Sequence, residues 1–323
     1  MNRTHGGPDA LGVPRWDFST NANACGPCPT ALAAVQQADA QHYPDPTYTA
    51  LCAALAAFHG VAAQRIVPAG SASEFIVRIT AAVAHSGGRQ VWLPALAYGD
   101  YAQAAQVWGL QRVSEPAQAD LLWLCEPSSP LGSAEIMANA VAGQGGVVVL
   151  DRAYEPLRLN GECSLSADAL DRVWQLWSPN KALGLTGVRG AYAIAPLHGL
   201  ALAHTLKQRA PSWPLGAHAV AMLTAWVQTD TQRWLAQSRA QLAAWKLAQE
   251  EMLEQTGWAC LPSEANYFCA RAPHPLDLPA LRAQGIKLRD TESLGLPGHW
   301  RLGVLPPDAQ QALKGALAAT ENE

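Results

Sequence analysis

The chain has 323 residues, of which 49% are hydrophobic and 15% charged, and its formal net charge is −4. This composition is typical of a globular protein with a sizeable core and excludes a disordered chain. It leaves no basic surplus for binding nucleic acid, and no apolar run approaches the roughly 20 residues that cross a bilayer. The N-terminal residues lack the apolar segment of a secretory signal, so we expect a cytoplasmic protein with reduced cysteines.

Only two of the seven cysteines are closely spaced, in the sequence Cys25-Gly26-Pro27-Cys28. This is the spacing of a thioredoxin-type redox pair, which needs a buried strand leading directly into a helix. Here the preceding residues are loop formers. The pattern therefore favours two small residues packed in a loop, and no second CxxC or CxxH completes a zinc site.

Short apolar segments in the middle of the chain predict buried strands, at 89–96, 120–127, 145–154, 171–179 and 189–196. Segments with apolar residues at helical spacing lie between them. Alternation of this kind predicts an α/β fold whose mostly parallel sheet is covered on both faces. Residues 214 to about 257 are predicted to be almost uninterrupted helix, and the residues after them to form a small α+β lobe.

The segment VPAGSASEF is a turn of small residues that opens a helix. The backbone N–H groups of Ala72 and Ser73, with the hydroxyls of Ser71 and Ser73, could bind a phosphate at the positive helix end. A helix N-cap explains the same residues, and the segment taken alone favours that explanation.

Two further polar groups follow predicted strands, where sites in α/β sheets lie. Asp151 ends an apolar strand, and its carboxylate could meet a ligand, cap a helix or pair with an arginine. Lys181 lies in a glycine-rich loop with Arg189 eight residues later. A lysine that is partly desolvated beside a guanidinium becomes a nucleophilic amine. Lys246 and Lys314 instead fall in surface-helix patterns and are expected to be solvated.

A phosphate-binding helix start, a strand-end carboxylate and a loop lysine near an arginine are together the groups that pyridoxal 5′-phosphate requires. With them, nearly the whole chain resembles the fold-type-I pyridoxal-phosphate enzymes. The resemblance implies a Schiff base on Lys181, a contact from Asp151 to the ring nitrogen, and phosphate contacts from Arg189, Ser178 and the helix start.

The same resemblance implies a large domain with a mostly parallel sheet and a small α+β C-terminal domain. The expected divisions are an N-terminal segment over the active site (1–40), a cofactor-binding domain (41–229) and a small domain (230–323).

Several motifs resemble those of the histidinol-phosphate aminotransferases. HYPDPTYTALCAALAAFHGV implies that Tyr43 reaches the partner's cofactor phosphate in a homodimer. LPALAYGDY implies that Tyr98 lies over the pyridine ring as a catalytic residue, and LDRAY implies that Tyr154 bonds the ring hydroxyl. HWRLGV implies that Arg301 pairs with the substrate carboxylate, which suits the fork of a guanidinium.

The segment DFSTNANACGPCP resembles the family's Asn-x-Asn-Pro-x-Gly-Pro-Pro segment near the substrate. It implies that Asn21 and Asn23 are substrate-binding residues. Cys25 and Cys28 then stand where relatives have prolines, so the likeness to thioredoxin is a coincidence.

One turn departs from the family. Its Asn-Pro-Asn-Asn-Pro-Thr-Gly reads here Glu126-Pro127-Ser128-Ser129-Pro130-Leu131-Gly132. Ser129 takes the place of the asparagine that bonds the cofactor's ring oxygen. A hydroxyl can still donate but is shorter, so Tyr154 carries more of that interaction.

The N-terminal sequence THGGPDALG, followed by WDFSTNANACGP, resembles the start of the L-threonine-O-3-phosphate decarboxylases of cobalamin synthesis. There the segment closes over the substrate phosphate, which implies contacts from His5, Gly6 and Gly7. The alternative is a loose leader that contacts nothing. The expected activity is therefore decarboxylation of L-threonine O-3-phosphate to (R)-1-amino-2-propanol O-2-phosphate.

Two alternatives stay open. An aminotransferase acting on histidinol phosphate or a related amino acid needs the same cofactor site. A non-catalytic relative that keeps the fold is favoured only by the altered Ser128–Ser129 turn, whereas the retained Lys181, Asp151 and Tyr154 argue against it. We expect a small phosphorylated amino acid as substrate, and neither a metal ion, nucleic acid nor a membrane as partner.

Overall fold

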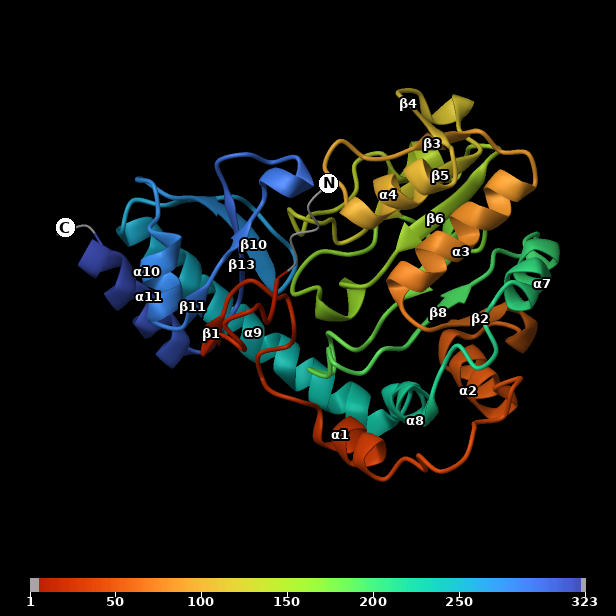
Figure 1. Cartoon of the computed structure of the whole chain (residues 1–323), viewed down its shortest axis with the longest axis horizontal. Helices are drawn as coiled ribbons and strands as arrows, with labels where there is room; N and C mark the ends of the chain where they lie inside the picture. The colour runs from red at the N-terminus through yellow and green to blue at the C-terminus, as the bar shows by residue number, and fades with distance from the viewer. Residues whose placement is uncertain (1–5, 321–323) are drawn as a thin grey trace.

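The computed structural model describes residues 6–320. Its larger sheet has seven strands in the order β2-β8-β7-β6-β5-β3-β4 (Figure 1). Strands β3 to β7 are mutually parallel, and β8 is antiparallel to both of its neighbours. The strands are β2 Ile66–Ala69, β3 Gln90–Trp92, β4 Gln111–Val113, β5 Leu121–Cys125, β6 Val147–Asp151, β7 Trp174–Trp177 and β8 Ala191–Ile194.

The predicted α/β fold with a mostly parallel sheet is confirmed, and the five predicted strands are β3, β5, β6, β7 and β8. Strands β2 and β4 were not predicted. β2 contains Pro68, which lacks the N–H that a ladder uses, and β4 is a short edge strand with a mostly exposed, polar sequence.

Helices cover both faces of this sheet. Along β5, Leu121 and Trp123 pack towards α3, α4 and α7, whereas Leu122 and Leu124 pack towards α5 and α6. This alternation explains why the strand is apolar throughout. The helices of this part are α1 Pro29–Gln36, α2 Thr49–His59, α3 Ala72–His85, α4 Gly99–Val107, α5 Ala138–Ala142, α6 Ala167–Leu170, α7 Leu200–Gln208 and α8 Ala217–Trp226.

A second, four-stranded antiparallel sheet has the order β12-β13-β10-β9, and the long helix α9 runs from beside it to the larger sheet's side (Figure 1). The predicted helix from 214 to 257 is broken at Val227–Gln228 into α8 and α9. The elements are α9 Thr229–Gln255, β9 Ala259–Cys260, β10 Tyr267–Arg271, α10 Leu278–Ala283, β12 Arg289–Asp290, β13 Trp300–Gly303 and α11 Pro307–Thr320.

The expectation of a solvated Lys246 was wrong. Lys246 lies on the inward face of α9, which also buries Leu242, Gln249 and Leu253. Its Nζ donates to the Ser263 carbonyl, and burial lowers its pKa. A lysine can be buried in this way because its long apolar stem packs while its ammonium group finds a carbonyl.

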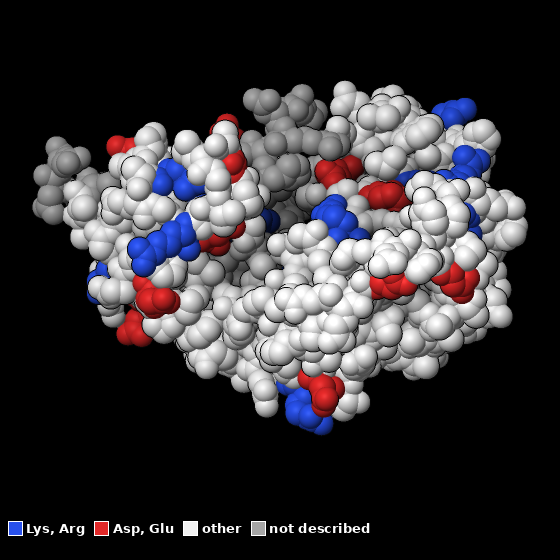
Figure 2. Space-filling model, turned by 60° about the horizontal axis from the view of Figure 1, so that its bottom comes forward, with Lys and Arg blue, Asp and Glu red and all other residues white. Residues whose placement is uncertain are grey.

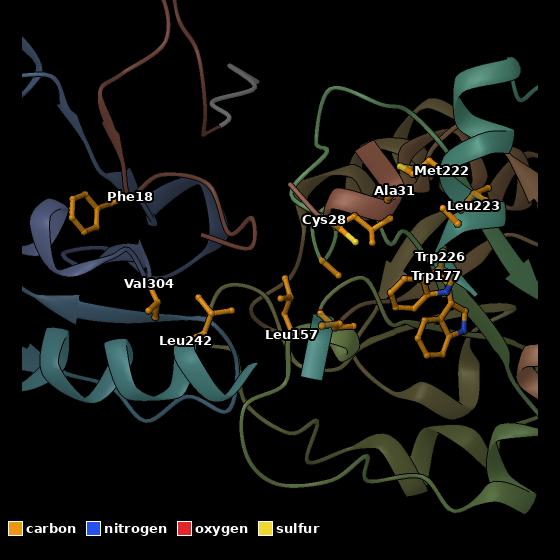
Figure 3. Close-up of a cluster of buried hydrophobic side chains, with 14 of the residues drawn as sticks. Phe18, Cys28, Ala31, Leu157, Trp177, Met222, Leu223, Trp226, Leu242 and Val304 are labelled. Carbon is orange, nitrogen blue, oxygen red and sulfur yellow. The ribbon is translucent and has the colours of Figure 1, made fainter. Parts of the chain in front are cut away.

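Both sheets share one core cluster, part of which is drawn in Figure 3. Trp177 and Trp226 belong to the larger part of the molecule, and Leu242 of α9 and Val304 after β13 to the smaller. Within the described part of the chain, none of the helices is long and apolar enough to span a membrane. Figure 2 shows acidic and basic side chains interspersed on one face, without a continuous basic patch.

The N-terminal segment is attached to the part of the molecule that contains the smaller sheet. β1 Trp16–Asp17 pairs in parallel with β11 Ile286–Lys287. Further along, Cys28 occupies the position before the first residue of α1 without a side-chain capping bond, and all seven cysteines are free. Burial raises the pKa of Cys25, which disfavours the thiolate that a redox pair needs.

Candidate active site

A cavity of about 550 Å³ lies where strands β5, β6 and β7 end. Its walls combine polar side chains from both sheets and from the N-terminal segment. The residues predicted for the site that line it are Gly6, Asn21, Ser71, Ala72, Ser73, Tyr98, Ser129, Asp151, Tyr154, Ser178, Lys181, Arg189 and Arg301.

Asp151 is the last residue of β6 and is only 5% exposed. Its carboxylate accepts hydrogen bonds from the Tyr101 hydroxyl at 2.7 Å and the Ala153 N–H at 2.9 Å. Burial raises the pKa of Asp151, and these two donors act against that shift. The carboxylate is paired with no arginine among the described residues, so it remains for a cationic or N–H donor ligand.

Lys181 lies in the turn after β7, and its backbone carbonyl accepts from the N–H of Asn23 at 2.9 Å. Its Nζ lies 5.3 Å from the centroid of the Tyr154 ring. Tyr154 follows β6 by three residues and packs edge-on against Tyr267. The ends of two neighbouring parallel strands thus bring a lysine, a carboxylate and a tyrosine to one cavity.

The start of α3 supplies another wall. Ser71 is the N-cap, and its Oγ accepts from the N–H of Glu74 at 3.0 Å, so the capping explanation is correct for this hydroxyl. Ala72 and Ser73 line the cavity, and first-turn N–H groups such as theirs have no partner within the helix. Ser73 Oγ lies 3.4 Å from the hydroxyl of Tyr98.

Two arginines enter the cavity from the smaller sheet. Arg289 of β12 and Arg301 of β13 are direct partners in the antiparallel ladder, and both are buried. Arg301 Nη1 donates to Ser129 Oγ at 3.3 Å, and its guanidinium lies 5.5 Å from the Tyr267 ring centroid. Burial, together with the charge of Arg301, lowers the pKa of Arg289.

Several buried polar atoms at the cavity find no partner among the described residues. They are Ser178 Oγ, Asn180 Oδ1, both side-chain atoms of Asn21, Arg289 Nη1 and Arg301 Nε. Buried polar groups are nearly always hydrogen-bonded, so these atoms indicate a polar ligand.

The described N-terminal residues are held against this cavity. Asp9 pairs with Arg282 at 2.9 Å and Lys287 at 2.9 Å, and Lys287 also donates to the Gly7 carbonyl. Gly7 N–H donates to Ser19 Oγ at 2.8 Å. A Cβ at Gly6 would lie 2.0 Å from the Ser19 carbonyl oxygen, so only glycine fits there.

Three of the predicted site residues that the structure describes do not line the cavity. Tyr43 is 77% exposed and stacks on Trp213 with ring centroids 4.2 Å apart. Asn23 Nδ2 donates to the Ala182 carbonyl, and Gly7 N–H donates to Ser19 Oγ. His5 lies outside the described residues.

Sequence reasoning missed Tyr101 and Arg289. Tyr101 lies one helical turn after Tyr98 in the motif AYGDY, which was a usable signal for a second inward side chain. Arg289 had no comparable signal, because only the pairing of β12 with β13 brings it beside Arg301.

Residues 15–317 match the family model of the aminotransferases of class I and II. The chain is 28% identical over 277 residues to histidinol-phosphate aminotransferase 2 of Rhizobium meliloti strain 1021, covering 79% of this chain and 78% of that one. It is 27% identical over 339 residues to histidinol-phosphate aminotransferase of Symbiobacterium thermophilum, covering 95% and 90%.

Solved structures are similar over most of their length. Histidinol-phosphate aminotransferase from Sinorhizobium meliloti, in complex with pyridoxal 5′-phosphate, has a TM-score of 0.75 at 21% identity and covers 92% of this chain and 88% of that one. L-threonine-O-3-phosphate decarboxylase from Porphyromonas gingivalis has a TM-score of 0.78 at 18% identity, with coverage of 95% and 99%. At these identities the likeness establishes the fold.

Proposed function

The chain belongs to the aminotransferase class I and II family and uses pyridoxal 5′-phosphate, and on that premise we propose that it transfers the amino group of a small phosphorylated amine. Relatives named histidinol-phosphate aminotransferase support this activity. They favour it over the decarboxylation expected from the N-terminal sequence. We expect the enzyme to act in the cytoplasm, as a homodimer in which Tyr43 serves the partner's site.

The pairing of Arg289 with Arg301 carries the proposal. A substrate with both a phosphate and a carboxylate, or with a phosphate alone, needs concentrated positive charge in a buried wall. Two guanidinium groups on adjacent strands supply it, and each retains a nitrogen without a partner among the described residues. Bidentate arginine contacts to such oxyanions are among the strong hydrogen bonds of proteins.

The residues of the cavity fit the cofactor. When bound, pyridoxal phosphate supplies an aldehyde that condenses with amines and a ring that withdraws electrons from the α-carbon. Arg189, Ser178 Oγ and the start of α3 would hold its phosphate. Asp151, oriented by Tyr101, would hold a proton at the ring nitrogen, and Lys181 Nζ would accept and return the α-proton of the substrate.

Decarboxylation of L-threonine O-3-phosphate remains the second candidate. One observation favours it: the segment beginning at Gly6 borders the cavity and is tied down by Asp9, as a segment that contacts the substrate phosphate must be. Both reactions use the same cofactor contacts and differ in which bond of the α-carbon breaks.

The test uses the cofactor-loaded protein with L-histidinol phosphate and 2-oxoglutarate, and measures glutamate. A parallel reaction contains O-phospho-L-threonine without any oxo acid, and measures carbon dioxide. Glutamate that depends on the phosphate group of the substrate supports transamination. Carbon dioxide with aminopropanol phosphate transfers the assignment to decarboxylation, and silence in both reactions rejects these two substrates.

A further inference from the structure

Arg158 is the centre of a buried ionic cluster outside the cavity. Its side chain is 5% exposed, and its Nη2 lies 2.9 Å from both Glu126 Oε1 and Glu155 Oε2. Its Nη1 pairs with Glu264. Burial alone would lower the pKa of Arg158, but the bonds and charges of the three glutamates outweigh it and raise that pKa. One guanidinium thus holds three carboxylates that belong to three separate loops.

The first of these loops leads to Ser129. Glu126 is fully buried and begins the turn that departs from the family's asparagine-rich sequence. Its Oε1 also accepts from the Ser164 N–H at 2.8 Å. Three residues later, Ser129 Oγ accepts from Arg301. A glutamate in place of the family's asparagine puts a charge into the interior, and Arg158 is the cation that neutralises it.

The second loop carries Tyr154. Glu155 follows Tyr154 directly, and Leu157 N–H donates to the Tyr154 carbonyl at 2.9 Å in the short turn that leads to Arg158. A shift of the Arg158 guanidinium should therefore also move the backbone of Tyr154, because one short hydrogen-bonded turn connects the two residues.

The third loop belongs to the smaller sheet's side. Glu264 N–H donates to the Gly132 carbonyl at 2.7 Å, and its own carbonyl accepts from Leu159 at 2.6 Å. Tyr267, at the start of β10, donates its hydroxyl to the Ser128 carbonyl at 2.7 Å. The ionic cluster thus joins loops that follow strands of the larger sheet to the loop that precedes β10 of the smaller sheet.

We propose that Arg158 is a positioning residue that, through Glu126 and Glu264, fixes the Ser129 turn and the Tyr154 loop relative to Arg301. It contacts neither cofactor nor substrate; it acts through the two loops whose side chains are proposed to do so. The inference rests on the proposed function for the roles of Ser129, Tyr154 and Arg301.

The experiment compares cofactor-loaded E126Q and R158M with wild type. Glutamine keeps the shape of Glu126 and removes only its charge, so it is the milder variant should R158M fail to fold. We expect a shifted visible absorption band and a pyridoxal-phosphate Kd raised about 10-fold, because the loops of Ser129 and Tyr154 move. We also expect KM for the amine to rise more than kcat falls, because Ser129, whose hydroxyl accepts from Arg301, is displaced and Arg301 is then no longer held in place. R158K is expected to show the same changes in absorption band, Kd and KM as R158M, since one ammonium group cannot bind three carboxylates at once.

E162Q is the matched control. Glu162 is an exposed glutamate bordering the same surface hollow as Glu155 and Arg158, and its neutralisation should leave spectrum, Kd and KM unchanged. In E126Q/R158M the spectral shift should equal that of R158M alone, because R158M already removes the ion pair that E126Q weakens. Additive shifts, or lowered Tm with an unchanged spectrum, Kd and KM, overturn the proposal. The spectrum and Kd need no substrate, so they decide this inference even if neither proposed amine is turned over.

Discussion

Arg289 and Arg301 lie opposite each other on β12 and β13 and border the same cavity. Each contacts a serine hydroxyl, Arg289 at Ser293 and Arg301 at Ser129. Burial first, and then the charge of Arg301, lower the pKa of Arg289, and a bound anion would relieve the repulsion between the two guanidinium groups. We therefore expect the pair to bind an anionic group of the substrate.

R289Q should weaken the contact to the phosphate of the substrate without changing the contacts to the rest of the substrate. A hydrogen bond to a charged group contributes about 1.5–3 kcal/mol, so KM for the phosphorylated amine should rise about 10- to 100-fold. The unphosphorylated amine should be nearly unaffected. Steady-state kinetics on both amines measure this, with R301Q as the comparison. Equal losses on both amines would show that Arg289 does not contact the phosphate.

The polar residues at the strand ends could be predicted from the sequence, because their placement depends only on which residues directly follow a buried strand. A buried strand followed by Asp151, and another followed by Lys181, place both groups at one edge of a parallel sheet whatever the details of packing. The buried strands β5 and β6 were equally clear, since their apolar runs are continuous.

What sequence could not supply is long-range pairing. Arg289 meets Arg301 through an antiparallel register between short strands, and Lys246 is buried because α9 turns that face inward. Tyr43 was assigned by resemblance to a partner's site, and within one chain it stacks on Trp213. Its place across a dimer stays a prediction.

D151N should stabilise the cofactor-free protein while removing activity. Because burial raises the folded-state pKa of Asp151 above its ordinary 3.8, ionising it costs stability once the pH exceeds about 4. An asparagine carries no charge and still accepts from Tyr101. The Tm of the cofactor-free variant at pH 7 should therefore be higher than that of wild type. Activity should fall at least about 100-fold, since an amide cannot hold the ring-nitrogen proton.

The pH dependence distinguishes removal of the cost of ionising Asp151 from a stabilisation by better packing of the asparagine. Wild type and D151N should converge in Tm below pH 4, where Asp151 is protonated. A constant difference from pH 4 to pH 8 would contradict a cost due to ionisation.

D9N should loosen the N-terminal segment. Arg282 first, and then Lys287, hold the pKa of Asp9 well below its ordinary 3.8, so the carboxylate stays ionised and paired down to strongly acidic pH. Its stabilising contribution is present above pH 3.8 and disappears only in acid. Limited proteolysis at neutral pH should cut D9N before residue 17 faster than wild type, and KM for the phosphorylated substrate should rise about 3- to 10-fold.

D230N is the control for D9N, because Asp230 pairs with Arg233 in an exposed position on α9. It should alter neither proteolysis nor KM. Unchanged KM in D9N, with faster proteolysis, would mean that the segment does not contact the substrate.

Acid should destabilise the fold through His59. The hydroxyl of Tyr192 accepts from Trp226 Nε1 at 3.1 Å and lies 2.7 Å from His59 Nε2, so a neutral His59 with an unprotonated Nε2 can accept the proton of that hydroxyl. Burial, and then the charge of Arg152, lower the pKa of His59 from 6.5 to about 4. Unfolding therefore takes up a proton between these values, and this group's stabilisation, about 2–3 kcal/mol, is lost as the pH falls from 6.5 to 4.

H59Q keeps an acceptor for Tyr192 but cannot titrate, so denaturant unfolding of the variant should show a shallower loss of stability over that range. Parallel curves for wild type and H59Q would contradict the assignment, and a difference confined to this range would establish His59 as the group that takes up the proton.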